Sequence, residues 1–152
     1  MGLVLIVTLM ALCWASGPGG AMDDQAFLAL IAKYETSQNT RDLGLLQSLL
    51  APNVTVWLPA GQGAPVLGAS AAIKFFVSFF SSFGSINEVV TQRIVSGTAA
   101  AIVKVFNAVA ANGCSISVPV IQNFVSLDGV ALSSITGVWN TTLFGQQFGC
   151  HK

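Results

Sequence analysis

The feature that most constrains the fold is a change in the spacing of apolar residues near Ser85. Before this point, apolar side chains recur three and four residues apart, which is the spacing of one helix face. After it, they alternate with period two, which is typical of strands. Asn112-Gly113 and Asp128-Gly129 are strong hairpin signals within this second part. Helices followed by an antiparallel meander predict an α+β domain with the helices on one sheet face.

Residues with known capping and stopping preferences set the expected helix limits. Asp23 and Asp24 are candidate N-caps of the first helix, and Pro52 ends the second. Ser70 is a candidate cap of the third helix, which stops at Gly84. In the first helix, Tyr34 should point inward because it shares a face with other apolar side chains. The expected helices are 24–37, 41–50 and 71–83.

The expected strands are 53–58, 86–95, 99–110, 114–127 and 130–144. Two-residue turns at both hairpins would place Gln122 opposite Val103 and Ile135. On this register one sheet face lies under the helices and carries Val103, Val105, Asn107, Val118, Val120, Gln122, Phe124, Ile135, Gly137, Trp139 and Thr141. The other face carries Ile102, Lys104, Phe106, Ile121, Asn123, Val125, Val138 and Asn140.

This second sheet face is more apolar than a face in contact with water should be. Between Val105 and His151 the only charged residue is Asp128. We therefore expect a second copy of the chain to cover part of the outer face, which predicts a homodimer.

The N-terminal segment resembles a secretory signal. The chain has 152 residues and a mean hydropathy of +0.73, which is high for a monomer of this size. Residues 3–14 form an apolar run of about 12 residues, shorter than the roughly 20 that a membrane span requires. We expect a signal peptide at residues 1–15, a flexible lead at 16–22 and the folded domain at 23–148. An uncleaved anchor is the alternative.

Secretion changes the interpretation of two asparagines and two cysteines. Asn53 and Asn140 each begin an N-x-Thr acceptor sequence for N-glycosylation. Removal of the signal peptide leaves Cys114 and Cys150, which could form a disulfide in an oxidising compartment or remain buried free thiols.

Three stretches together resemble the SnoaL-like and ketosteroid-isomerase-like branch of the nuclear transport factor 2-like (NTF2-like) superfamily. They are "KYETSQNTRDLGLLQSLLAPNVTVWLPAG", "VLGASAAIKFFVSFF" and "SVPVIQNFVSLDGVALSSITGVW", within residues 24–145. The resemblance implies a cone in which a curved mixed or antiparallel sheet wraps around the N-terminal helices. It also implies an apolar pocket in the cone and, in many members, a dimer through the outer sheet face.

The resemblance also suggests roles for individual residues. Isomerases of this family take a proton from carbon beside a ketone, using a carboxylate base and two donors to the enolate oxygen. Tyr34 in "KYETSQN" matches the first donor, and Gln122 in "VIQNF" occupies the place of the second, an aspartic acid. The base precedes a proline on the first strand, and in "TVWLP" that position is Leu58, which cannot accept a proton.

The remaining carboxylates do not fall on predicted inward positions, and Glu88, near a strand start, is the least excluded. The sequence offers no metal site, indicates no cofactor, and its 8% of charged residues include no basic patch for nucleic acid. Tyr34 could equally be a core residue whose hydroxyl binds Gln122 or Asn107. The candidate ligand-binding residues are Tyr34, Leu58, Asn107, Gln122, Phe124 and Trp139.

Three functional hypotheses follow. The first is a secreted protein that binds a small apolar molecule in the cone without catalysis. The second is an isomerase, cyclase or dehydratase that polarises a carbonyl with Tyr34 and Gln122. The third is a structural or interaction dimer with a filled core.

Overall fold

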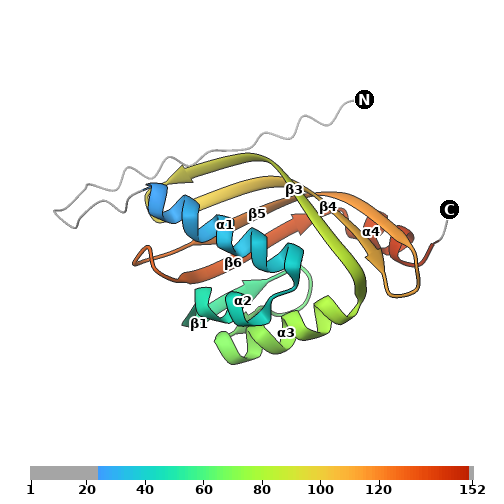
Figure 1. Ribbon diagram of the computed structural model, residues 1–152, viewed down its shortest axis with the longest axis horizontal. Helices are drawn as coiled ribbons and strands as arrows, with labels where there is room; N and C mark the ends of the chain where they lie inside the picture. Colours follow the sequence, from blue (N-terminus) through green and yellow to red (C-terminus); the bar gives the residue numbers. More distant parts are fainter. Residues whose placement is uncertain (1–23, 151–152) are drawn as a thin grey trace.

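A computed structural model describes residues 24–150 (Figure 1). The signal peptide expected at 1–15, the lead at 16–22, Asp23 and His151 lie outside the described residues. The elements are α1 (Asp24–Thr40), α2 (Leu43–Leu49), β1 (Leu50–Trp57), β2 (Val66–Leu67), α3 (Ala69–Ser81), β3 (Phe83–Ser96), β4 (Ala99–Ala110), β5 (Ser115–Val125), β6 (Leu132–Trp139) and α4 (Thr141–Phe148).

One six-stranded sheet, in the order β2-β1-β6-β5-β4-β3, forms the body of the molecule. β1 pairs with β6 in parallel, and every other neighbouring pair is antiparallel. Figure 1 shows the sheet curving around α1, while α2 and α3 lie beside β1 and α4 lies at the far end. The predicted α+β class, a curved mixed sheet wrapped around the N-terminal helices, is confirmed.

α1 buries one face against the sheet, as its apolar spacing predicts. Phe27, Ile31 and Tyr34 are at most 1% exposed, and the helix runs to Thr40, three residues further than expected. Asp42 caps α2, because its carboxylate accepts a hydrogen bond from the Leu45 amide at 2.9 Å. The residue before α3 is Gly68, whose φ of 86° favours glycine, and the expected cap at Ser70 lies within the helix.

The predicted register of β4 is wrong by one residue. Gln122 pairs with Ile102, because the β4–β5 connection contains Ala111, Asn112 and Gly113 instead of two residues. A shift of one residue turns every side chain of a strand to the other face. The inward residues of β4 are therefore Ala100, Ile102, Lys104, Phe106, Ala108 and Ala110.

The β5–β6 register differs from the prediction by two residues. Because side chains alternate between the two faces, a shift of two leaves each β6 side chain on its predicted face. Gln122 pairs with Gly137, and Phe124 pairs with Ile135. The expected strand 130–144 is too long, because β6 ends at Trp139 and a helix follows. The Asn140 side chain accepts a hydrogen bond from the Leu143 amide at 2.8 Å and so caps α4.

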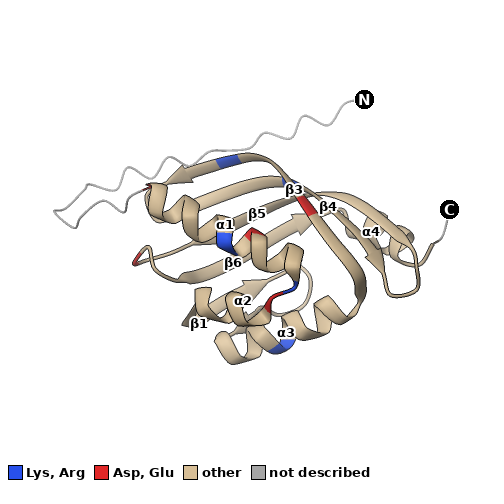
Figure 2. Ribbon diagram, in the orientation of Figure 1, with Lys and Arg blue, Asp and Glu red and all other residues tan. Residues whose placement is uncertain are grey.

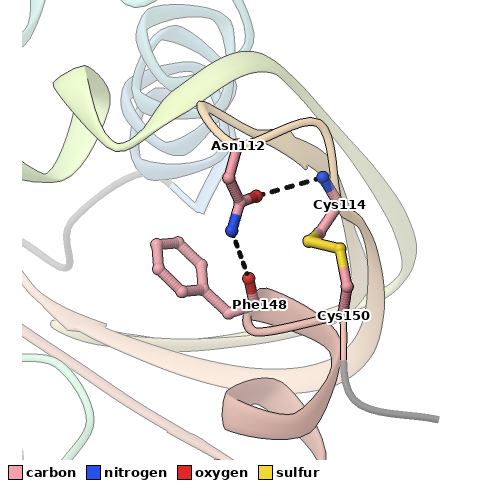
Figure 3. Close-up of a disulfide and its surroundings, with 4 residues drawn as sticks. All are labelled: Asn112, Cys114, Phe148 and Cys150. Carbon is pink, nitrogen blue, oxygen red and sulfur yellow. Dashed lines mark hydrogen bonds between the residues drawn. A yellow bond between two sulfur atoms is a disulfide. The ribbon is translucent and has the colours of Figure 1, made fainter.

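The C-terminal end is fastened to the β4–β5 connection (Figure 3). Cys114 and Cys150 form a disulfide with a Cα–Cα distance of 5.4 Å. The Asn112 side chain accepts from the Cys114 amide at 3.1 Å and donates to the Phe148 carbonyl at 2.9 Å. These contacts hold α4 against the end of the sheet.

The outer sheet face exposes several large apolar side chains. Val89, Ile94, Ile121 and Val138 are between 44% and 55% exposed. Figure 2 shows charged residues thinly spread over the fold. The homodimer through this face stays a prediction. Within residues 24–150, no helix is long and apolar enough to cross a membrane.

Candidate functional site

A hollow opens between α1, α3, α4 and the inner face of the sheet. Counted out to its open mouth it has a volume of about 450 Å³, of which about 40 Å³ is open to a water-sized sphere. Aromatic rings form much of its wall: Phe75, Phe76, Phe79, Phe106, Trp139 and Phe144. Leu58, Val118 and Val120 complete the apolar part.

Three polar residues of the wall lie diagonally next to one another on the neighbouring strands β3, β4 and β5. Glu88 pairs with Phe106, so on the shared face it lies diagonally next to Lys104 of β4. Lys104 pairs with Val120, which places it diagonally next to Gln122 of β5. From the other side, α1 contributes Tyr34 and Gln38, which are 1% and 2% exposed.

These side chains form one hydrogen-bonded chain. The Lys104 ammonium donates to Glu88 Oε1 at 2.6 Å and to Gln122 Oε1 at 2.5 Å. The Gln122 amide nitrogen then donates to the Tyr34 hydroxyl oxygen at 2.8 Å. The side chains of Glu88 and Lys104 are 5% and 3% exposed, so this ion pair is shielded from water. Gln122 is one of the two hydroxyl partners expected for Tyr34.

Two buried atoms in this wall have no hydrogen-bond partner among residues 24–150: Glu88 Oε2 and Gln38 Nε2. A buried polar atom without a partner is costly and rare in folded proteins. The Tyr34 oxygen accepts from Gln122, and its own proton has no acceptor in the described part of the chain. Tyr34, Gln38 and Glu88 all line the hollow, so its wall holds one acceptor and two donors whose hydrogen bonds are not yet made within the described residues.

Burial changes the proton affinity of two groups in the chain of hydrogen bonds. Desolvation, followed by the negative charge of Glu88, raises the pKa of Tyr34 well above its ordinary value. Desolvation lowers the pKa of Lys104, and this effect is opposed by the attraction of Glu88. Tyr34 therefore remains a neutral hydrogen-bond donor throughout the physiological pH range.

The backbone of Glu88 is held by the neighbouring helix. Asn39 of α1 accepts from the Glu88 amide at 2.6 Å and donates to the Glu88 carbonyl at 3.4 Å. β3 is an edge strand, so these two contacts anchor the strand to α1. A register shift follows between Val90 and Gln92. Such irregularities frequently redirect side chains beside functional sites.

Leu58, which the resemblance assigns to the position of the base, lies at the wall and follows β1. It packs over Gly137, where an added Cβ would fall 2.6 Å from Leu58 Cδ2. The Leu58-Pro59 peptide bond is cis. Of the predicted ligand-binding residues, Tyr34, Leu58, Gln122 and Trp139 line the hollow, and their ligand contacts stay predictions.

Two predicted site residues lie elsewhere. Phe124 is buried behind Tyr34, with ring centroids 5.0 Å apart. Asn107 is on the outer face, where its side chain accepts from Ser117 Oγ at 2.8 Å. The inward position expected for Asn107 is therefore wrong, for the same one-residue shift that turns Lys104 inward.

Sequence reasoning missed Gln38, named Glu88 only as the least excluded carboxylate, and placed Lys104 on the outer face, although all three line the hollow. The signal that could have found Lys104 is the charge of a single lysine within an apolar strand, which demands a buried partner. Residues 24–150 hold no group of three or more histidine, cysteine or acidic side chains that could bind a metal ion together.

Comparisons with known proteins identify the family of the chain and agree with its fold. A family profile described as SnoaL-like domain matches residues 31–129. No curated protein matches the chain in sequence. A putative SnoaL-like polyketide cyclase from Jannaschia sp. CCS1 superimposes with a TM-score of 0.75 at 13% identity, covering 91% of this chain and 100% of that one.

Two further solved structures share the fold. A protein with a ketosteroid isomerase-like fold from Catenulispora acidiphila, in complex with trimethylamine, gives a TM-score of 0.70 at 15% identity, covering 79% of this chain and 92% of that one. A LEH-like epoxide hydrolase from M. tuberculosis gives a TM-score of 0.71 at 8% identity, covering 84% of this chain and 92% of that one. Identities this low establish the fold alone. Together with the family match over most of the domain, they show that the chain belongs to the SnoaL-like domain family and has its NTF2-like, ketosteroid isomerase-like fold.

Proposed function

We propose that this protein binds a small, largely apolar molecule in the hollow. The observation that carries the proposal is the composition of the wall, in which apolar and aromatic side chains surround one group of buried polar atoms. This combination is typical of small-molecule sites. The hollow also counts against a core filled entirely by side chains. Structural neighbours described as a polyketide cyclase and an epoxide hydrolase support a small-molecule role.

The size of the hollow indicates how a ligand would enter. The open volume of about 40 Å³ is too small for a ring system. Phe75, Phe79, Trp139 and Phe144 are partly buried, so they are the aromatic side chains with room to rotate. We expect these rings to move apart when a ligand binds, as the walls of adaptable sites do.

Uptake of the neutral fluorescent probe N-phenyl-1-naphthylamine tests the proposal. Val120→Phe replaces a small side chain of the wall with an aromatic ring that fills the hollow, so it should abolish uptake. Ile121→Phe is the matched control, because Ile121 is the next residue of β5 and is 46% exposed on the other face. Uptake by the native chain and by Ile121→Phe, but not by Val120→Phe, is expected. Equal uptake by all three would place the probe elsewhere and count against the proposal.

The position of Glu88 favours a second candidate, an isomerase, cyclase or dehydratase. Glu88 Oε2 is an unpaired carboxylate oxygen in the wall, and the Tyr34 hydroxyl can donate to a carbonyl oxygen. Gln122 would act by orienting Tyr34, since it hydrogen-bonds the phenol. For a ligand identified in the native protein, Glu88→Gln and Tyr34→Phe should stop conversion while binding persists. Unchanged conversion in both variants would exclude this chemistry.

We also propose that the protein is secreted. The Cys114–Cys150 disulfide supports this, since such bonds persist in oxidising compartments. The two acceptor asparagines, Asn53 and Asn140, are exposed. Mass spectrometry of the protein from the culture medium should show cleavage before Ser16 and glycans on both asparagines. An intracellular, unprocessed chain would refute it.

A further inference from the structure

We infer that the ligand of the hollow carries a hydroxyl group, which Glu88 and Gln38 recognise together. The inference rests on the proposed function and specifies its ligand. It starts from the two unpartnered atoms in the described wall, Glu88 Oε2 and Gln38 Nε2. Glu88 Oε2 can only accept hydrogen bonds, and Gln38 Nε2 can only donate them.

A hydroxyl group carries both the donor and the acceptor that these two atoms lack. Its proton is donated to Glu88 Oε2, and its oxygen accepts from Gln38 Nε2. The second lone pair of the oxygen can accept from the Tyr34 hydroxyl, whose proton has no acceptor among the described residues. Hydrogen bonds to charged groups are the stronger kind, so the contact with Glu88 contributes most to recognition.

Other functional groups fit less well. A ketone or ether can only accept, so it leaves Glu88 Oε2 unpartnered in an apolar surrounding. A carboxylate ligand would place a second negative charge beside Glu88, whose own charge is already matched by Lys104 at 2.6 Å. A plain hydrocarbon leaves both atoms without partners. Among hydrocarbons, ethers, ketones, carboxylates and alcohols of the same shape, the hollow therefore selects the neutral alcohol.

Glu88 is held in place before a ligand arrives. Glu88 Oε1 is fixed by Lys104, and the backbone of Glu88 is held by Asn39 of the helix that carries Gln38. The side chains of Gln38 and Glu88 are at least nine-tenths buried. Such preorganisation strengthens discrimination, because little ordering remains to be done upon binding.

Four probes with the same ring test the inference: cyclohexanol, cyclohexanone, cyclohexyl methyl ether and cyclohexanecarboxylate. Their dissociation constants are measured by ligand-observed NMR with the native chain. Cyclohexanol should bind about tenfold or more tightly than the ketone and the ether, and the carboxylate should not bind. Equal affinity for alcohol, ketone and ether would overturn the inference, including the case in which water molecules alone complete the two atoms. Binding of none of the four, nor of the naphthylamine probe, would instead refute the proposed function.

Substitutions test which residues produce the preference for alcohol over ketone. In Glu88→Gln the amide oxygen faces Lys104, and the amide nitrogen replaces Oε2, so the preference for alcohol over ketone should disappear. Gln38→Met should weaken alcohol and ketone by similar factors and keep their ratio. Gln47→Met, on the exposed face of α2, is the matched control and should bind like the native chain. If Glu88→Gln does not fold, the inference is decided by the ratios of dissociation constants measured with the native chain and with Gln38→Met. A preference retained in folded Glu88→Gln would overturn the role of Glu88.

Discussion

Replacing Lys104 with methionine tests whether the polar chain in the wall is a coupled unit. Methionine keeps the apolar stem of lysine and removes the ammonium, which contacts Glu88 and Gln122. The variant leaves the Glu88 carboxylate, 5% exposed, without its counter-charge. In the double variant Lys104→Met/Glu88→Met, both charges are absent.

The expected magnitudes follow from burial. Removing one partner of a buried ion pair costs about 3–5 kcal/mol, whereas replacing both with apolar side chains is often neutral or stabilising. The double variant still leaves Gln122 Oε1 without a donor, which costs about 1–3 kcal/mol. We therefore expect Lys104→Met to lower the free energy of unfolding by about 4 kcal/mol. The double variant should stay within about 2 kcal/mol of the native chain.

Urea unfolding followed by far-ultraviolet circular dichroism at neutral pH, with the disulfide intact, measures both values. Lys74→Met is the control, because it removes the ammonium of a lysine that lies exposed on α3. That variant should lose about 1 kcal/mol or less. The reasoning fails if Lys104→Met costs no more than the control, or if the double variant loses the sum of the two single losses.

Two further predictions concern single residues of the fold. Tyr34 is the only tyrosine, so the absorbance of phenolate reports its ionisation alone. Because its pKa is raised, Tyr34 in the folded chain should stay protonated at pH values above 10.0, where the tyrosine of the urea-unfolded chain ionises. Because the folded state binds this proton more tightly, its contribution to stability is full below the unfolded pKa and is lost as the pH rises above it; ionisation of the folded chain near 10.0 would contradict this. Cys150→Ser opens a loop with a sequence separation of 36 and should cost about 4 kcal/mol in urea unfolding, and a loss below about 1 kcal/mol would contradict the tethering role of the disulfide.

The parts of the fold that depend on local spacing could be predicted from the sequence. Helical phase places Tyr34 inward once the apolar face of the first helix is recognised. The change of period near Ser85 predicts the meander, and Asn112-Gly113 predicts the position of its second turn, between β4 and β5. These features are local, so no knowledge of distant contacts is needed.

The site itself depended on a turn length that the sequence does not specify. Asn-Gly is compatible with loops of two or three residues, and the three-residue connection turned Lys104 inward and Asn107 outward. Glu88 gained significance only with Lys104 beside it, because an isolated carboxylate on an edge strand is usually exposed. Residues 141–144 read as strand because Thr141 and Thr142 favour strands, although Asn140 also offers a helix cap.

The most direct test of the central claim is a crystal structure of the protein soaked with cyclohexanol. Our account predicts the ring among Phe76, Phe106 and Val120, with its oxygen within about 3.2 Å of both Glu88 Oε2 and Gln38 Nε2. A hollow closed by side chains, or a probe found only outside it, would contradict the account.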